Sequence, residues 1–247
     1  MFPSAWGWLL AGAFIAEVIG TMAGFGAATI LTPIATLFMD VKTAIALVAC
    51  FHLFGNGSRL VFFGRHVRWR IWGQFGLTGV LCSLVGAGVT AWLPSAAVEL
   101  LFGCFLLIYV ATSLTAAGRM PLPERPLTLI GGGAASGFVA GLLGTGGAIR
   151  SACLLVFRLP KEAYIGTSAA IALLVDATRL PVYVAGQLLP SRMIPVLLSL
   201  VLVAFSGSWV GQHLITRISA TTFRRIVLVM LALMGVKCVL TGWHGLG

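Results

Sequence analysis

The amino-acid sequence predicts an all-α, polytopic membrane protein made of two inverted-topology repeats. Two observations predict the class: of the 247 residues 59% are hydrophobic and only 9% are charged, and the apolar residues form long, unbroken runs. A soluble domain is typically about 25% charged, so lipid must be the main solvent of this chain. Runs without the period-two alternation of barrel strands favour helices, which satisfy their own backbone hydrogen bonds in lipid.

Eight apolar runs follow one another along the chain. Six of them have about the 20 residues that a spanning helix needs; they cover 44–63, 71–92, 96–117, 162–185, 193–216 and 222–242. The other two, 6–38 and 127–157, are too long for one span, and glycines break them at 20–26 and 141–147. Each half is therefore predicted to contain one broken helix and three transmembrane helices.

The two halves are related by a shift of 120 residues. This shift aligns four pairs: Gly24 with Gly144, Gly26 with Gly146, Asn56 with Asp176, and Arg59 with Arg179. A polar, proline-rich stretch at 119–126 is the predicted linker. The first transmembrane repeat is then 1–118 and the second is 127–247.

Loop charges predict how the broken runs sit in the membrane. If each broken run crosses once, the Lys and Arg residues of the loops divide six against six and give no orientation. If each is a re-entrant hairpin, ten of these residues lie on one side, and only Lys42 and Arg192 lie on the other. The ten are Arg65, Arg68, Arg70, Arg119, Arg125, Arg158, Lys161, Arg217, Arg224 and Arg225. This asymmetry is expected of a bacterial inner-membrane protein, and three crossings per half make the repeats inverted. Both termini then face away from the cytoplasm.

The net charge of +10 points to the lipid bilayer as a partner, not to nucleic acid, because excess Lys and Arg orient membrane helices and face anionic lipid. The five cysteines lie inside apolar runs without CxxC spacing, so neither disulfides nor a zinc site is expected. The sequence contains no set of ligands for a metal and no nucleophile–base motif. We therefore expect neither a cofactor nor an enzyme, and a homo-oligomer is an open alternative to a monomer.

The glycine breaks are candidate anion-binding sites. A break inside an apolar run leaves amides that lipid cannot satisfy, and the helix that resumes after it presents its N-terminus to the membrane interior. The alternative is that these glycines only allow close helix packing. Paired breaks in two repeats favour a transporter site. The predicted binding residues at the breaks are Gly24, Phe25, Gly26, Ala27, Gly144, Thr145, Gly146 and Gly147.

Polar residues within the apolar runs supply further candidates. Charges inside spans are costly, so they are usually functional. Candidate substrate contacts are Asn56, Arg59, Arg150, Ser168, Asp176 and Arg179. Asp176 and Arg179 are three residues apart on one helix face, so a purely structural ion pair is an equal alternative. Arg150 lies one turn past the second break, and its alternative role is to snorkel to an interface. Candidates for proton coupling are Glu17, His52 and Asp176, although a lone histidine is more often a packing residue.

These residues resemble the sulfite exporter TauE/SafE family. The resemblance rests on the two glycine-broken helices, Pro33, the Gly166-Thr167-Ser168 stretch and above all the run 161–183, and it covers nearly the whole chain. Cys153 stands where the first repeat has Pro33, and Arg150 occupies a place that is usually apolar. The resemblance implies a bacterial inner-membrane carrier of sulfite, organosulfonates or related small sulfur anions.

The leading functional hypothesis is therefore a secondary transporter that moves a small sulfur-containing anion by alternating access. Coupling to protons and coupling to another cation are equally open, as are import and export. The alternatives are a passive anion channel, a transporter of an unrelated small anion, and an intramembrane enzyme or assembly factor.

Overall fold

The computed structural model describes residues 3–23, 27–115, 122–214 and 220–246, and these residues form helices and turns without a strand. The helices before residue 116 are α1 (Pro3–Ala23), α2 (Ala28–Ala35), α3 (Val41–Phe63), η1 (Gly64–His66), α4 (Trp69–Trp92) and α5 (Ser95–Leu114). Those after residue 121 are α6 (Pro126–Leu143), α7 (Gly147–Val156), α8 (Lys161–Ala185), η3 (Ser191–Met193), α9 (Ile194–Leu214) and α10 (Ala220–His244). The predicted all-helical class is confirmed for this part of the chain.

The helix boundaries follow the predicted runs closely. The six runs of spanning length correspond to α3, α4, α5, α8, α9 and α10, and each broken run contains two helices, α1 with α2 and α6 with α7. Within the described residues, six segments are long and apolar enough to cross a membrane: Val41–His66, Trp69–Trp92, Ser95–Leu114, Pro126–Leu143, Lys161–Ala185 and Ser191–Gly211. The protein is therefore a multi-pass membrane protein.

The outer surface is also suited to lipid. Large apolar side chains such as Leu77, Leu202 and Leu233 are exposed along the middle of α4, α9 and α10. Exposed tryptophans lie near helix ends, as in the aromatic belts of membrane proteins; they are Trp8, Trp69, Trp92, Trp209 and Trp243.

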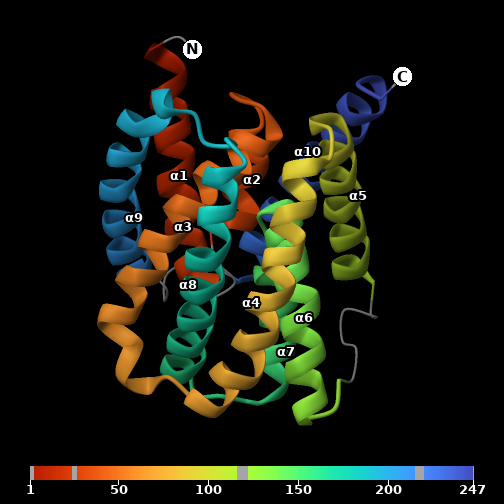
Figure 1. The fold of residues 1–247 in the computed structure, drawn as a ribbon. Helices are drawn as coiled ribbons and strands as arrows, with labels where there is room; N and C mark the ends of the chain where they lie inside the picture. Colours follow the sequence, from red (N-terminus) through yellow and green to blue (C-terminus); the bar gives the residue numbers. More distant parts are fainter. Residues whose placement is uncertain (1–2, 24–26, 116–121, 215–219, 247) are drawn as a thin grey trace.

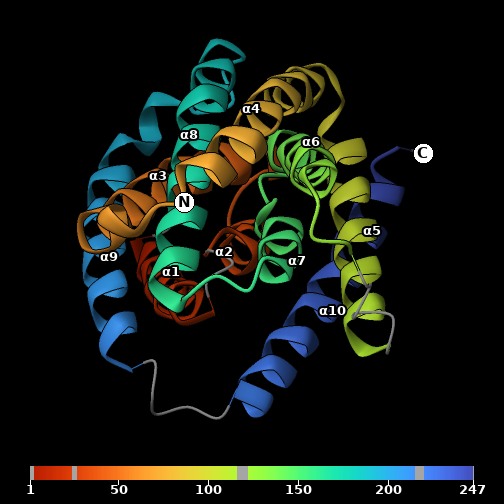
Figure 2. The same cartoon turned by 90° about the horizontal axis from the view of Figure 1, so that it is seen from below.

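The helices run mainly along one common direction (Figure 1). α1 starts at the upper end of this view, where N is marked, and the C-terminus lies at the same end. α6 starts at the opposite, lower end. Seen along that direction, α2 and α7 lie near the centre, α1, α9, α3, α8, α4 and α6 surround them, and α5 and α10 pack together at one side (Figure 2).

Glycines allow α6 to pack directly against α4. Gly133, Gly137 and Gly141 repeat every fourth residue and form one face of α6. A Cβ atom at any of these three positions would collide with a backbone carbonyl oxygen of α4. Small residues of this kind let membrane helices approach closely. For this part of the second glycine-rich run, the close-packing interpretation is therefore correct.

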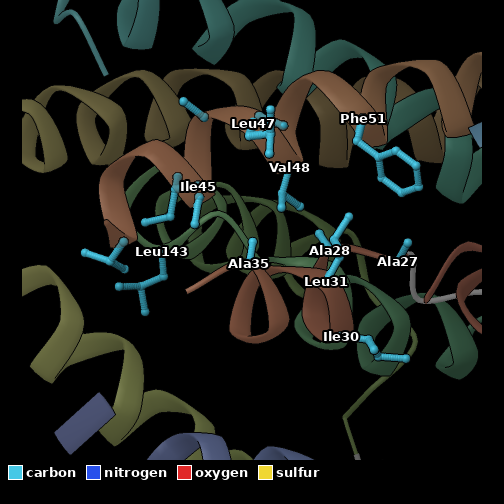
Figure 3. Packing of buried hydrophobic residues seen from close by; sticks show 14 of the residues in the cluster. Ala27, Ala28, Ile30, Leu31, Ala35, Ile45, Leu47, Val48, Phe51 and Leu143 are labelled. Carbon is cyan, nitrogen blue, oxygen red and sulfur yellow. The ribbon is translucent and has the colours of Figure 1, made fainter. Parts of the chain in front are cut away.

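The short helix α2 is held by apolar contacts. Seven of its eight residues are buried. Figure 3 shows Ala28 and Leu31 of α2 facing Val48 and Phe51 of α3. The backbone of α2 is thus enclosed by protein, which is the condition under which a helix end can be placed inside a membrane.

Candidate functional site

A polar cluster occupies the interior where α3 and α8 pack against each other. Within the described residues, six acidic, basic or histidine side chains are buried: Glu17, His52, Arg59, Arg150, Asp176 and Arg179. All six are among the residues that the sequence singles out. Burying a charge is costly unless it is paired, so each partner indicates what that charge does.

Asp176 is held by Arg179 on the same helix. The Nε and Nη2 atoms of Arg179 lie 3.0 and 2.7 Å from Oδ1 of Asp176, so the guanidinium group donates two hydrogen bonds to one oxygen. Arg179 also donates to the carbonyl oxygens of Ala140 and Gly144 at the end of α6. The two side chains pair as their spacing predicts, and the pair fastens α8 to α6.

His52 of α3 contacts the other oxygen of Asp176, with Nδ1 2.7 Å from Oδ2. The carboxylate is ionised because Arg179 donates twice to it, so Oδ2 accepts and Nδ1 carries the proton. Asn56 completes the group: its Nδ2 lies 3.4 Å from the same Oδ2, to which it donates, and 3.1 Å from Nδ1 of His52. The Nε2 atom of His52 is buried and has no hydrogen-bond partner within the described residues.

A second ion pair joins α3 to α1. Arg59 pairs with Glu17, and its Nε also donates to the hydroxyl of Thr21, 3.1 Å away. Ser208 of α9 donates to Glu17 over 2.7 Å. Because Nη1 of Arg59 donates to Oδ1 of Asn56 at 2.9 Å, the two ion pairs form one continuous hydrogen-bonded network. This network extends from α9 through α1, α3 and α8 to α6.

Arg150 differs from the other buried arginines. It is only 5% exposed, which is not the arrangement of a side chain that snorkels to an interface. Its Nε donates to the hydroxyl of Ser168 over 3.0 Å. No carboxylate in the described part of the chain lies within 4 Å of its guanidinium group.

None of the acidic residues of this chain is a partner of Arg150. The sequence contains six of them, and each lies in a described segment. Glu17 and Asp176 belong to the network, and Glu99 pairs with Lys237. Asp40 caps the N-terminus of α3. The last two, Glu124 and Glu162, are exposed. In the described segments, Arg150 is therefore a buried cation that no carboxylate contacts.

The second glycine break places the N-terminus of α7 in the interior. Gly144 ends α6 in the left-handed region with φ 75°, and its N–H donates to the carbonyl of Ala140, so this predicted binding amide is already used. The next three residues, Thr145, Gly146 and Gly147, are buried. Their N–H groups have no acceptor in the segments that the structure describes. Such amides at a helix start can bind an anion.

The two breaks are connected by a hydrogen bond between hydroxyls. Thr29 of α2 and Thr145 before α7 lie 2.8 Å apart, Oγ1 to Oγ1. Ala27 precedes α2, and its carbonyl accepts from the N–H groups of Ile30 and Leu31. The predicted binding residues Gly24, Phe25 and Gly26 lie outside the described residues.

Sequence reasoning missed three members of the cluster. Tyr183 follows Arg179 by one helical turn and donates to the carbonyl of Gly141. Its i,i+4 spacing from a predicted site residue was an available signal. The other two, Thr21 and Ser208, are single hydroxyl residues in apolar helices, and no pattern in the sequence distinguishes them.

Comparison with known families decides what kind of protein contains this cluster. The family model described as sulfite exporter TauE/SafE matches residues 9–238. The chain belongs to the sulfite exporter TauE/SafE family. The match includes every member of the buried cluster, from Glu17 to Ser208, and the predicted resemblance is confirmed. TauE/SafE proteins form a transporter family, so this protein is a membrane transporter, not a member of an enzyme family. No curated protein gives a significant match to the sequence.

The two halves of this TauE/SafE protein contribute unequally to the cluster. At a shift of 120 residues, Arg150 corresponds to Ile30 and Ser168 corresponds to Val48. The second half thus supplies the uncompensated cation and its hydroxyl partner, whereas the first half has apolar side chains at both positions.

Proposed function

We propose that this protein is a secondary transporter that moves a small sulfur oxyanion, such as sulfite or an organosulfonate, across the bacterial inner membrane by alternating access. The observation that supports this best is Arg150, a buried arginine without a carboxylate partner in the described chain. An unpaired charge in this position is costly, and an anionic substrate would offset the cost during each cycle.

The groups around Arg150 suit the oxygen atoms of such an anion. A guanidinium group donates several hydrogen bonds in a fixed plane, and the hydroxyl of Ser168 lies 3.0 Å from it. The N-terminus of α7, three residues before Arg150, adds amide donors and the positive end of the helix dipole. Sulfite and sulfonates have three oxygens on one sulfur atom and can accept from all of these donors together.

The proposed alternating access rests on an inverted repeat, with residues 119–126 as the linker between the halves. Packing in the helix bundle supports this arrangement. α1 packs on α9 as α6 packs on α4, and α3 packs on α9 as α8 packs on α4. Exchanging α1–α5 with α6–α10 converts each of these pairs into the other. The opposite starting ends of α1 and α6 in Figure 1 also agree with inverted halves.

We further propose that α1 with α2, and α6 with α7, are re-entrant hairpins. The six crossings are then α3, α4, α5, α8, α9 and α10, and α6, although it is long enough to cross, returns through α7 to its own side. α2 and α7 have only eight and ten residues, or about 12 and 15 Å of helix, which is too short to cross a bilayer. Their central position in Figure 2 gives each short helix a protein environment. Exposed basic residues at the α3–α4, linker and α7–α8 junctions support a cytoplasmic location for these junctions; they are Arg65, Arg68, Arg70, Arg125, Arg158 and Lys161.

Transport in proteoliposomes tests the proposal. We expect saturable uptake of labelled sulfite that accelerates when the vesicles are preloaded with unlabelled sulfite, because a carrier exchanges substrate. Flux that does not saturate would indicate a passive channel. Nitrate competing as well as sulfite would indicate a transporter of unrelated small anions.

Substitution of Arg150 tests the site. Arg150→Gln should weaken the affinity for sulfite at least about tenfold, since a charged hydrogen bond contributes about 1.5–3 kcal/mol, and it should therefore lower both the sulfite flux at low concentration and the thermal stabilisation by sulfite. Arg70→Gln changes an exposed arginine at the start of α4 and is the matched control. A folded Arg150→Gln variant with the flux of the control would place the substrate elsewhere. The same thermal-shift measurement identifies the preferred anion when it is repeated with thiosulfate, sulfate, taurine and sulfoacetate.

A further inference from the structure

The buried charges of the described chain do not sum to zero. Two are negative, on Glu17 and Asp176, and three are positive, on Arg59, Arg150 and Arg179. With His52 neutral, one positive charge therefore remains, and a singly charged anion cancels it. A doubly charged anion would leave one negative charge in a low-dielectric interior, where such an excess is costly.

His52 is placed to supply the missing positive charge. Its Nδ1 donates to Asp176, so the neutral ring has its lone pair on Nε2. That atom is buried and has no partner within the described residues. A proton added there converts the ring to an imidazolium, whose second N–H needs an acceptor. The carboxylate on the opposite side of the ring stabilises this charged form.

Other charged and titratable side chains lie on α3 and on the elements that pack against it. α8 presents Asp176 and Arg179 to His52, and Arg59 lies two turns away on α3 itself, paired with Glu17 of α1. α2 has no titratable residue. The remaining titratable groups near by in the chain or on packed elements are Cys50 on α3, Lys161, Glu162, Tyr164 and Tyr183 on α8, Glu99, Cys104 and Tyr109 on α5, Arg65 and His66 on η1, and His213 on α9. Arg150 faces the same interior from α7, and the charges of Asp176, Arg59 and Arg179 act on it.

The anion-binding and proton-binding groups are coupled through α8. Ser168, which contacts Arg150, and Asp176, which contacts His52, are eight residues apart on one helix face, or about 12 Å. At that separation in a protein interior, two charges still interact appreciably. Binding of the anion therefore favours the proton, and by linkage the proton favours the anion equally.

We propose that His52 sets the charge of the substrate that the site accepts. The neutral site takes a singly charged oxyanion, and the site with a proton on Nε2 of His52 takes a doubly charged oxyanion together with that proton. The proposal rests on the proposed function, because it assumes that the anion binds at Arg150. For a doubly charged substrate it assigns the coupling ion as H⁺ and assigns His52, not Glu17, as its carrier.

Two tetrahedral sulfur oxyanions of fixed charge test this idea. Sulfate is a dianion and methanesulfonate a monoanion throughout the range from about pH 5 to 8, over which histidine titrates. In titrations of the purified protein in detergent, the affinity for sulfate should fall as the pH rises, with a slope that approaches tenfold per pH unit, as expected for one linked proton. The affinity for methanesulfonate should be nearly independent of pH. In weakly buffered solution, binding of sulfate should be accompanied by uptake of close to one proton per protein molecule. Binding of methanesulfonate should be accompanied by none.

The informative variant is His52→Asn, because the side-chain amide of Asn replaces Nδ1–H as a donor to Asp176 but does not titrate. It should bind sulfate weakly at every pH and take up no proton. His213→Gln changes an exposed histidine and is the matched control. Its sulfate affinity should depend on pH as that of the unmodified protein does. If a folded His52→Asn variant keeps the pH dependence of sulfate affinity, the proposal is overturned. So would sulfate binding without proton uptake in the unmodified protein, a result that does not depend on any variant folding.

Failure of this inference can be separated from failure of the proposed function. If Arg150→Gln abolishes binding of methanesulfonate but His52→Asn keeps the pH slope for sulfate, the site is correct and the role of His52 is wrong. If Arg150→Gln binds methanesulfonate like the unmodified protein, the site itself is wrong.

Discussion

The side-chain amide of Asn56 lies 3.4 Å from Oδ2 of Asp176, and these two residues are 120 positions apart in the chain. The same shift aligns the two halves of the sequence, so each residue meets its own counterpart. In the proposed inverted repeat, two equivalent positions touch each other only close to the axis that relates the halves. The proposal therefore places this axis at the centre of the buried network.

The Asn56–Asp176 contact predicts strong coupling between substitutions. Asp176→Asn leaves Arg179 buried without a carboxylate and should cost about 3–5 kcal/mol. Asn56→Asp places two carboxylates side by side and should also destabilise. In the double variant the cluster again contains one carboxylate, so the double change should cost about 0.5–3 kcal/mol less than the two single changes together. Thermal unfolding in detergent measures this, and additive losses would contradict the expected coupling.

The Glu17–Arg59 pair is expected to behave as a unit. Glu17→Gln leaves Arg59 as an unpaired buried charge, which should cost about 3–5 kcal/mol of stability. Changing both residues to Gln removes that charge and should recover part of the loss. Glu99→Gln is the matched control, because its partner Lys237 is about one-third exposed and pairs of this kind contribute little. A double variant less stable than Glu17→Gln would show that the charge of Arg59 is needed for another reason.

The glycine face of α6 gives a sharp comparison within one helix. Gly141→Ala should destabilise by about 1–3 kcal/mol, because the new methyl group would collide with the carbonyl of Ser83 on α4. Gly131→Ala adds the same methyl group where no atom lies within 4 Å, and it should be neutral or slightly stabilising. The two variants are compared by their yields of monodisperse protein and by their melting temperatures. Equal behaviour would mean that α4 and α6 separate easily.

The proposed topology predicts the location of both chain ends. With two re-entrant hairpins and six crossings, the N- and C-termini would lie on the side opposite the basic loops, in the periplasm. Alkaline phosphatase fused after residue 247 should therefore be active, and the same reporter inserted at the α3–α4 junction should be inactive. The reverse pattern would refute the orientation, and activity at both sites would refute the count of crossings.

The helices were predictable from sequence because lipid imposes a simple rule on long apolar segments. The runs 71–92 and 162–185 correspond to α4 and α8 within two residues at each end. Glycine breaks also indicated correctly that α6 and α7 are separate helices. The Asp176–Arg179 pair was predictable for the same reason, since its partners are neighbours on one helix.

The contacts between distant helices were not predictable. Nothing in the sequence places His52 on Asp176, because their meeting depends on how α3 and α8 cross. Glu17 appeared as an isolated acid in the first run, and only the packing of α1 against α9 and α3 gives it Arg59 and Ser208 as partners. The special position of Arg150 became visible only when the partners of the other charges were known.

The pairing of Glu17 with Arg59 and of Asp176 with Arg179 has an electrical consequence. A voltage of 100 mV does about 2.3 kcal/mol of work on each elementary charge that crosses the full membrane. Each ion pair is neutral, so moving it through this field requires almost no work. In the proposed cycle the field then acts mainly on Arg150. A negative cell interior would pull the empty carrier inward, and it would leave the carrier loaded with a monoanion nearly unaffected.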